Sequence, residues 1–402
     1  MMIEQWKYLP EGILMDILTW LPVKSVLRFR CVSRKWCNHF TNPDFIKLHA
    51  NHSTHCSLIL TKQDPNKFYS GIQSEPYSAS CPCLDHNISG DDVTFDLSIE
   101  YRCPFHYWKC YIHIIGIYNG LICLRSDPKL LCIWNPVTNE YKKLPEIPDL
   151  PPQIAGLVPV FVNTPTYGFG FDCKTGDYKV VKILTPGRGK GSKVWIYTSG
   201  TDSWRVLEDI YYVVYLSGEN GVFLNGVLHW MVQPSDRPIR VILSFGVGNE
   251  KFGELQLPMP LSGEPEGKNY YKSSIGLLDG KLCLSWYIRD GNVDVWVMKN
   301  YGVIESWTKL FSVSRLKEDI EYLRPVQSLK NGDILLFGRP LNQLSRYNGD
   351  LIFYNPNSGN ARFLDTSGYK KLDDARAYVG SLVSVKSIFT AGQEDVEQAM
   401  SQ

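Results

Sequence analysis

The densest group of residues that could do chemistry is a run of cysteines and histidines between positions 81 and 113. Its members are Cys81, Cys83, His86, Cys103, His106, Cys110 and His113. Thiolates and imidazoles are the usual ligands of zinc, but Cys-x-Cys-x-x-His and Cys-x-x-His-x-x-x-Cys match no standard zinc frame. Because free cysteines often pack as small core residues, we expect burial in strands here, with a metal site as the alternative.

A glycine-rich basic stretch, Gly187-Arg188-Gly189-Lys190-Gly191-Ser192-Lys193, hints at phosphate binding. It lacks the Walker A spacing and lies between two expected strands, without the helix whose N-terminus would hold a phosphate. We therefore expect a basic loop that could contact an acidic substrate, and no nucleotide cofactor.

Catalytic residues are hard to find in this chain. It contains no Cys-x-x-Cys pair, which a zinc-containing RING ligase would need. No Ser-His-Asp set or carboxylate pair stands out, and His229 lies inside an apolar strand, as a satisfied core histidine would. We expect a protein that is not an enzyme and that binds no cofactor.

Composition narrows the class of protein further. The 402 residues include 42 Lys+Arg and 41 Asp+Glu, a net charge of +1 that argues against a nucleic-acid binder. The 32 Gly and 24 Pro, together with 17 Phe, 11 Trp and 23 Tyr, favour short strands joined by turns. The eleven cysteines are irregularly spaced, and the sequence shows no secretory signal and no membrane-spanning apolar run. These features indicate a reducing compartment, the cytoplasm or nucleus.

A repeat organises most of the chain. Asn-Gly, Asp-Gly or Thr-Gly turns between apolar runs place glycines at 120, 176, 226, 280 and 332, which are 56, 50, 54 and 52 residues apart. A second hairpin follows each first one, over 132–144, 194–204, 242–255, 295–307 and 351–363. Two hairpins in about 50 residues make one four-stranded, kelch-like blade.

We therefore expect a mainly β protein, with a β-propeller of about six blades; five or seven remain possible, and a multi-sheet sandwich is the alternative. Residues 55–109 are long enough for a sixth, degraded blade. Tyr378–Val385 would supply a final strand that pairs with it and closes the ring.

The first fifty residues differ from the rest, because their apolar residues recur at helical spacing. They predict three short helices: one opening at Leu9-Pro10-Glu11, one after Pro22, and one capped by Ser33. Seven Lys/Arg against four Asp/Glu make this module basic. Three such helices bury little core alone, so we expect a partner or the next domain to complete them.

These helices resemble the F-box, the motif that docks the Skp1 adaptor of cullin-based ubiquitin ligases. The resemblance rests on Leu9-Pro10, Ile13, Ile17-Leu18, Leu21-Pro22, Lys24-Ser25, Phe29-Arg30-Cys31-Val32-Ser33-Arg34, Trp36, Pro43 and Phe45, in the family's order. It implies that the adaptor-binding surface is formed or supported by Leu9, Pro10, Ile13, Ile17, Leu21, Pro22, Val26, Cys31, Val32 and Trp36. Gly12 departs from the pattern and should weaken the first helical turn by under about 1 kcal/mol.

The repeats are similar to the plant F-box-associated domain, a family that includes S-locus F-box proteins and relatives that limit immune receptors. The similarity is carried by Trp134-Asn135-Pro136, Tyr167-Gly168-Phe169-Gly170-Phe171-Asp172, Gly226-Val227-Leu228-His229-Trp230, Val293-Asp294-Val295-Trp296-Val297-Met298 and Ser306-Trp307-Thr308-Lys309. It implies an F-box over 1–50, a propeller over 51–390 and a polar tail over 391–402. It also implies the substrate-recognition subunit of an SCF ubiquitin ligase, whose partners are Skp1, cullin, a RING subunit and a protein substrate.

Exposed loops of a propeller usually read the substrate. The aromatic residues that fall in or beside such loops are Tyr211, Tyr212, Tyr215, Tyr270, Tyr271, Trp286 and Tyr287. Packing at blade edges is the alternative for each of them. Other functions left open are a propeller-type binding or sugar-binding module, a propeller enzyme, and an F-box protein that acts outside a ligase.

Overall fold

The computed structural model describes most of the helical module and the centres of the repeats. The described residues are 10–52, 56–62, 78–80, 100–102, 112–126, 130–148, 165–186, 191–213, 219–236, 240–258, 273–288, 292–314, 316, 320, 322–339, 349–364 and 372–389.

Four helices open the described chain, where the sequence predicted three. They are α1 (Glu11–Thr19), α2 (Val23–Arg30), α3 (Arg34–Thr41) and α4 (Pro43–His52). Pro10 and Pro22 are the N-caps of α1 and α2, and the Ser33 hydroxyl caps α3 by accepting a 3.3 Å bond from the Trp36 amide. The additional helix follows from Asn42, whose side chain accepts from the Asp44 amide at 2.8 Å, with Pro43 at the first helical position.

The described strands form six antiparallel sheets, here called blades 1 to 6. Blade 1 contains β25 (Leu372–Val379), β1 (Cys56–Lys62), β2 (Ser78–Ser80) and β3 (Glu100–Arg102). Blade 2 contains β4 (Ile112–Tyr118), β5 (Leu121–Ser126), β6 (Leu130–Asn135) and β7 (Glu140–Lys143). Blade 3 contains β8 (Thr166–Asp172), β9 (Asp177–Leu184), β10 (Lys193–Thr198) and β11 (Ser203–Val206).

Blade 4 has five strands: β12 (Tyr212–Val213), β13 (Val222–Leu224), β14 (Val227–Pro234), β15 (Val241–Gly246) and β16 (Lys251–Leu255). Blade 5 contains β17 (Ser274–Leu278), β18 (Lys281–Tyr287), β19 (Val293–Met298) and β20 (Trp307–Val313), with a 3-10 turn, η5 (Ile304–Ser306), before its last strand. Blade 6 contains β21 (Tyr322–Ser328), β22 (Ile334–Arg339), β23 (Asp350–Tyr354) and β24 (Ala361–Phe363).

The blades close into a ring through their innermost strands. Contacts run from β4 to β8, then to β13 and β14, β17, β21, β25 and back to β4. The five predicted turn glycines all adopt positive φ, from +70° at Gly120 to +86° at Gly332, the region that glycine enters without steric cost. The prediction of a mainly β chain with a propeller of about six blades is therefore confirmed.

The ring is closed by strands from opposite ends of the propeller. β25 pairs antiparallel with β1, from Cys56 opposite Val379 to Lys62 opposite Leu372. The predicted closing strand, 378–385, was placed about six residues too late. The chain leaves the sheet after Val379 because residues 381–385 bind blade 2 and the helices instead.

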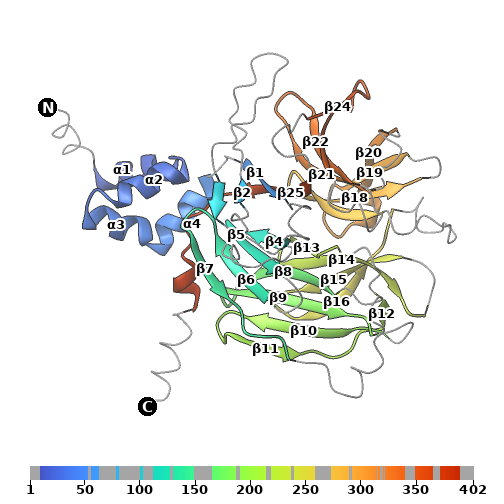
Figure 1. The fold of residues 1–402 in the computed structure, drawn as a ribbon, viewed down its shortest axis with the longest axis horizontal. Helices are drawn as coiled ribbons and strands as arrows, with labels where there is room; N and C mark the ends of the chain where they lie inside the picture. The colour runs from blue at the N-terminus through green and yellow to red at the C-terminus, as the bar shows by residue number, and fades with distance from the viewer. Residues whose placement is uncertain are drawn as a thin grey trace, which may run out of the picture.

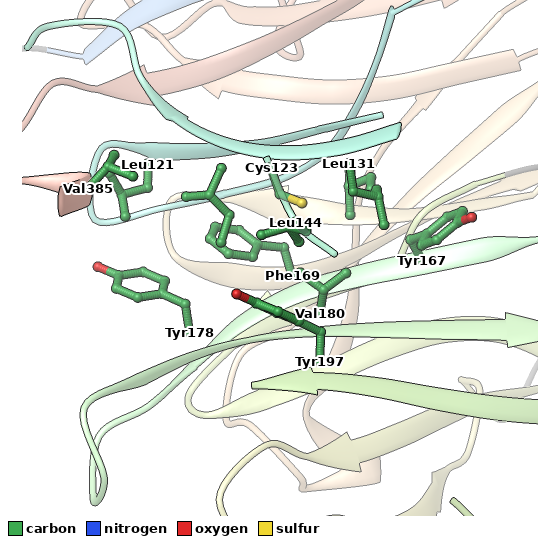
Figure 2. Close-up of a cluster of buried hydrophobic side chains, with 12 residues drawn as sticks. Leu121, Cys123, Leu131, Leu144, Tyr167, Phe169, Tyr178, Val180, Tyr197 and Val385 are labelled. Atoms are coloured by element: carbon green, nitrogen blue, oxygen red, sulfur yellow. The ribbon is translucent and has the colours of Figure 1, made fainter. Parts of the chain in front are cut away.

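Large aromatic and aliphatic side chains fill the spaces between blades. In the cluster between blades 2 and 3, Phe169 and Tyr178, both from blade 3, stack with ring centroids 5.6 Å apart. Figure 2 shows Val385, from the C-terminal segment, beside Leu121 of this cluster. In Figure 1 the helices, in blue, form a group beside the sheets, with the C-terminal helical turn in red next to them.

Candidate functional site

Helix α1 and the turn that follows it, with Trp20 as the C-cap and then Leu21, are apolar on two faces, and only one of them is buried. Leu14, Leu18 and Leu21 recur at i, i+4 and i+7 and pack into the core of the helical module. Ile13, Ile17 and Trp20 recur at the same spacing but are 50%, 44% and 64% exposed. Residues at this spacing share one helix face. We call Ile13, Ile17 and Trp20 the α1 stripe; it is an apolar face with no cover in the described structure.

The other residues that the sequence assigned to an adaptor surface fall into two groups. Pro10, Pro22, Cys31 and Val32 are all exposed, Val32 to 68%. Val26 is fully buried, while Leu21 and Trp36 are half-buried and pack against the same core, so these three would support the surface from beneath. Leu9 lies outside the described residues.

Sequence reasoning missed three exposed apolar side chains of this module: Trp20, Phe29 and Leu48. The i, i+4, i+7 spacing from Ile13 would have identified Trp20. Its indole stacks on the His52 ring at 4.2 Å between centroids, and His52 Nδ1 lies 2.9 Å from the Thr19 hydroxyl. These contacts hold Trp20 at the edge of the module and leave most of its surface free.

A chain of aromatic contacts braces the helices from inside. The ring centroids of Phe29 and Trp36 lie 5.8 Å apart, those of Trp36 and Phe40 5.4 Å, and those of Phe40 and Phe45 5.1 Å. Beyond them, His49 Nε2 lies 2.8 Å from the Leu21 carbonyl oxygen. Burial lowers the pKa of His49, so the ring stays neutral at pH 7.

The helical module is seated on the propeller by the segment that follows β25. Leu382 belongs to the same buried cluster as Leu18, Val26, Phe40 and Phe45. The flanking Ser381 and Val383 carbonyls accept bonds of 3.1 and 2.7 Å from the Asn135 side chain at the end of β6. The core of the helices is thus completed by the propeller's own C-terminal segment, and the two parts share one packed joint.

The predicted substrate contacts are distributed unevenly. Tyr211 is 80% exposed, and beside it the Tyr212 hydroxyl donates a 2.8 Å bond to Glu254. Both line a surface pocket on blade 4 together with Asp209, Ile210, Pro234, Ser235, Asp236 and Glu254. Tyr215, Tyr270 and Tyr271 lie outside the described residues.

The last two predicted contacts lie in blade 5. Trp286 is half-buried against the cluster shared by blades 4 and 5. Tyr287 is only 7% exposed and packs with Val293 and Leu323 between blades 5 and 6. Its side chain offers almost no surface to a partner, because it faces this core, and we leave it out of any substrate surface.

The remaining candidate residues carry little chemistry in the described chain. Of the Cys/His group only His113 is described, and the described residues include no group of three or more His, Cys, Asp and Glu that could hold a metal. Residues 187–190 of the basic loop are outside the described ranges, and Lys193 pairs with Asp209. His229 is fully buried between the Val222 carbonyl and the Tyr301 hydroxyl, 3.0 and 2.8 Å away, so the prediction of a satisfied core histidine is confirmed.

A helical module with an exposed apolar stripe, seated on a propeller, is the architecture of an F-box protein. Residues 6–48 match the F-box domain, and residues 58–387 match the F-box associated beta propeller domain. The chain belongs to this family of F-box proteins, which confirms the resemblance seen in the sequence.

Its relatives include several Arabidopsis thaliana proteins. It is 27% identical to the F-box/kelch-repeat protein At3g23880 over 94% of this chain and 95% of that one. It is 29% identical to F-box protein CPR1, over 79% and 76% of the two chains, and 31% identical to F-box protein At4g22390, over 81% and 80%. Among the helices that the structure describes, none combines the length and the apolar character needed to cross a bilayer.

Proposed function

We propose that this protein is the substrate-recognition subunit of an SCF ubiquitin ligase. The F-box binds a Skp1-like adaptor, which brings the cullin and the RING subunit, and the propeller captures a protein substrate. The α1 stripe carries this proposal, because it is an exposed apolar face on the helix that begins the F-box. A complementary apolar groove on the adaptor would cover Ile13, Ile17 and Trp20 and exclude water from them.

The mechanism is proximity. A substrate held on the propeller has its lysines at a high effective concentration beside the charged conjugating enzyme. No catalytic residue of this chain is required, so the protein acts as a non-enzymatic adaptor in the cytoplasm or nucleus. The joint at Leu382 supports this role, because a packed joint fixes the distance from substrate to adaptor better than a flexible linker.

Tyr211 and Tyr212 stay proposed as substrate contacts because the described chain holds them at an open pocket of blade 4. Tyr and Trp serve as anchors at many interfaces, where they combine apolar area with a polar tip. Proximity labelling in plant cells, with and without proteasome inhibition, would identify proteins that accumulate beside the wild type. A Tyr211→Ala variant should lose those proteins and keep the adaptor.

Co-purification from plant cells tests the adaptor role. Wild-type protein should recover a Skp1-like adaptor and a cullin. An Ile13→Ala/Ile17→Ala variant should lose both, while Val206→Ala, a change at an apolar residue 59% exposed on β11, should keep both. Failure of the wild type to recover the adaptor would contradict the proposal. Recovery of the adaptor without cullin would instead indicate an F-box protein that acts outside a ligase.

A further inference from the structure

The axis of the propeller encloses a cavity of about 210 Å³ that is partly open to solvent. It is lined by innermost strands from several blades, including β4, β17, β21 and β25. A cavity of this size has room for a small ligand or for several water molecules. Its charged lining consists of Glu219, Arg324, Arg339, Asp373, Asp374 and Arg376.

Half of these charged groups are satisfied by one another. Asp374 accepts a 2.7 Å bond from the Arg324 guanidinium and another of 2.7 Å from Arg376 Nε. Arg324 also donates to the Ala375 carbonyl at 2.8 Å and to the Tyr322 hydroxyl at 3.2 Å. Asp374 and its two arginines therefore form a closed network on one wall of the cavity.

The other three groups are satisfied only in part: Glu219 is hydrogen-bonded to Tyr322, and the charge of Arg339 acts on both Glu219 and Asp373. Asp373 is 9% exposed, and neither of its carboxylate oxygens has a hydrogen-bond partner in the described structure. The same is true of Glu219 Oε1 and of Arg339 Nε, whose guanidinium lies over the Tyr322 ring at 4.7 Å. A buried polar group without a partner costs about 1–3 kcal/mol, and more when it is charged.

The unpartnered atoms show which kind of hydrogen-bonding group would complete the cavity. Three acceptor oxygens, on Asp373 and Glu219, stand against one donor, Arg339 Nε. These acceptors all belong to acidic side chains, and burial raises the pKa of both groups, so Asp373 keeps a proton at pH 7 while no bound cation lies beside it. An ion pair with Asp373 therefore forms as that proton leaves. Apolar side chains, among them Ile275, Leu277 and Phe337, line other parts of the same space.

We propose that the axial cavity binds a small basic group, an ammonium or guanidinium on a short aliphatic stem, with Asp373 and Glu219 as its acceptors. Such a group supplies several donors and a positive charge. Its stem would lie against the apolar part of the lining. Arg339 opposes the incoming charge, but Arg324 and Arg376 are already neutralised in part by Asp374. A metal ion is disfavoured, because no described group of His, Cys, Asp and Glu has the arrangement to hold one.

Two sources offer this chemistry: a free aliphatic amine or guanidine, and the Lys or Arg side chain of a bound protein. The proposal is independent of the adaptor role, since the cavity lies in the propeller and the adaptor surface in the helices. Calorimetric titration of the full-length protein can separate the sources. One arm uses agmatine and n-butylamine. The other uses short peptides with blocked termini, in which a single central Lys or Arg is the only charged group.

Saturable binding is expected in at least one arm, and n-butanol, which has the stem without the charge, should not bind. Asp373→Asn and Glu219→Gln should each weaken binding by about tenfold or more, the loss typical of a charged hydrogen bond. Glu305→Gln, at an exposed carboxylate in η5 of blade 5, should leave it unchanged. Both cavity variants are isosteric, and their melting temperatures check that they fold.

Binding of the free amines alone would assign the cavity to a small molecule, and binding of the peptides would assign it to a protein side chain. Three results would each overturn the proposal: no saturable binding of any basic probe, equal binding of n-butanol, or undiminished binding by the folded Asp373→Asn protein.

Discussion

The side-chain amide nitrogen of Asn135 lies 2.7 Å from the backbone carbonyl oxygen of Val383, across 248 residues of sequence. Asn135 is fully buried and also donates to the Ser381 carbonyl at 3.1 Å, while its own carbonyl oxygen accepts from the Val137 amide at 2.9 Å. One asparagine therefore orders a turn of blade 2 and holds the segment that carries Leu382 into the F-box core.

Replacing Asn135 by Leu should free the F-box from the propeller. The change leaves two carbonyls and an amide without their partner, which should lower the free energy of unfolding by about 2–4 kcal/mol. Hydrogen exchange should rise across the helices, residues 11–52. The matched control is Asn355→Leu, because Asn355 orders the equivalent Asn-Pro turn of blade 6 but donates to Asp333 at 2.8 Å. Faster exchange in the helices of both variants would contradict this account of the joint.

Alanine substitutions at Gly120 and, as its control, Gly280 test the contact of blade 2 with the C-terminal segment. Both adopt φ near +70°, but a Cβ on Gly120 would lie 2.5 Å from the Ser381 hydroxyl oxygen, whereas one on Gly280 would meet nothing within 4 Å. Gly280→Ala should cost only the backbone strain, about 1–2 kcal/mol. Gly120→Ala should cost clearly more, because it also displaces the C-terminal segment. Equal costs in urea unfolding would show that Ser381 moves aside freely.

Lys179 ties blade 3 to blade 4 and should matter far more than a surface lysine. It is 5% exposed, with its ammonium 3.1 Å from Asp172 and 2.9 Å from Glu250. Lys179→Met should lower the free energy of unfolding by about 3–5 kcal/mol, because Asp172 is left buried without its cation. Lys142→Met removes a pair with Asp202 in which both side chains are more than a third exposed, and should cost under about 1 kcal/mol. Similar losses from the two changes would refute the buried role of Lys179.

Asp373 should give the protein a pH-dependent stability. Burial, and then the negative charge of Asp374, raise the pKa of Asp373 to about 8. The folded state keeps a proton there that the unfolded chain loses near pH 4, so stability falls as pH rises from about 4 to 8. Asp373→Asn should remove this slope. Relative to the wild type, its free energy of unfolding should be higher at pH 8.5 than at pH 5.5, by on the order of 2 kcal/mol. Urea unfolding at both pH values measures it, and an unchanged slope would exclude Asp373 as its source.

Much of the fold follows from short-range signals. The turn glycines and apolar runs predict the hairpins of blades 2 to 6, because a turn with positive φ is encoded in two or three residues. The extra helix at Pro43 and the early end of the closing strand were not predicted. Residues 380–385 look like a continuation of β25, and only their contacts with Asn135 and with the helices direct them away.

The sites are less predictable than the fold, since burial is decided by other parts of the chain. The spacing of Ile13, Ile17 and Trp20 is visible in the sequence, but their exposure depends on which face of α1 meets α4 and Leu382. Tyr287 looked like a loop residue and is instead covered by blade 6. Asp374 bonds to both Arg324 and Arg376, whereas its neighbour Asp373 has no hydrogen-bond partner in the described structure, and the contact with Arg324 spans 50 positions of sequence.

The central claim, that this F-box docks a Skp1-like adaptor through the α1 stripe, is tested most directly by a calorimetric titration of two purified proteins. The wild type should bind the adaptor, and Ile13→Ala/Ile17→Ala should bind at least about tenfold more weakly, because two anchors of the interface are truncated. Alanine preserves the helix, and Val206→Ala should bind like the wild type. A wild type that does not bind, or a double variant that binds as tightly, would contradict the account.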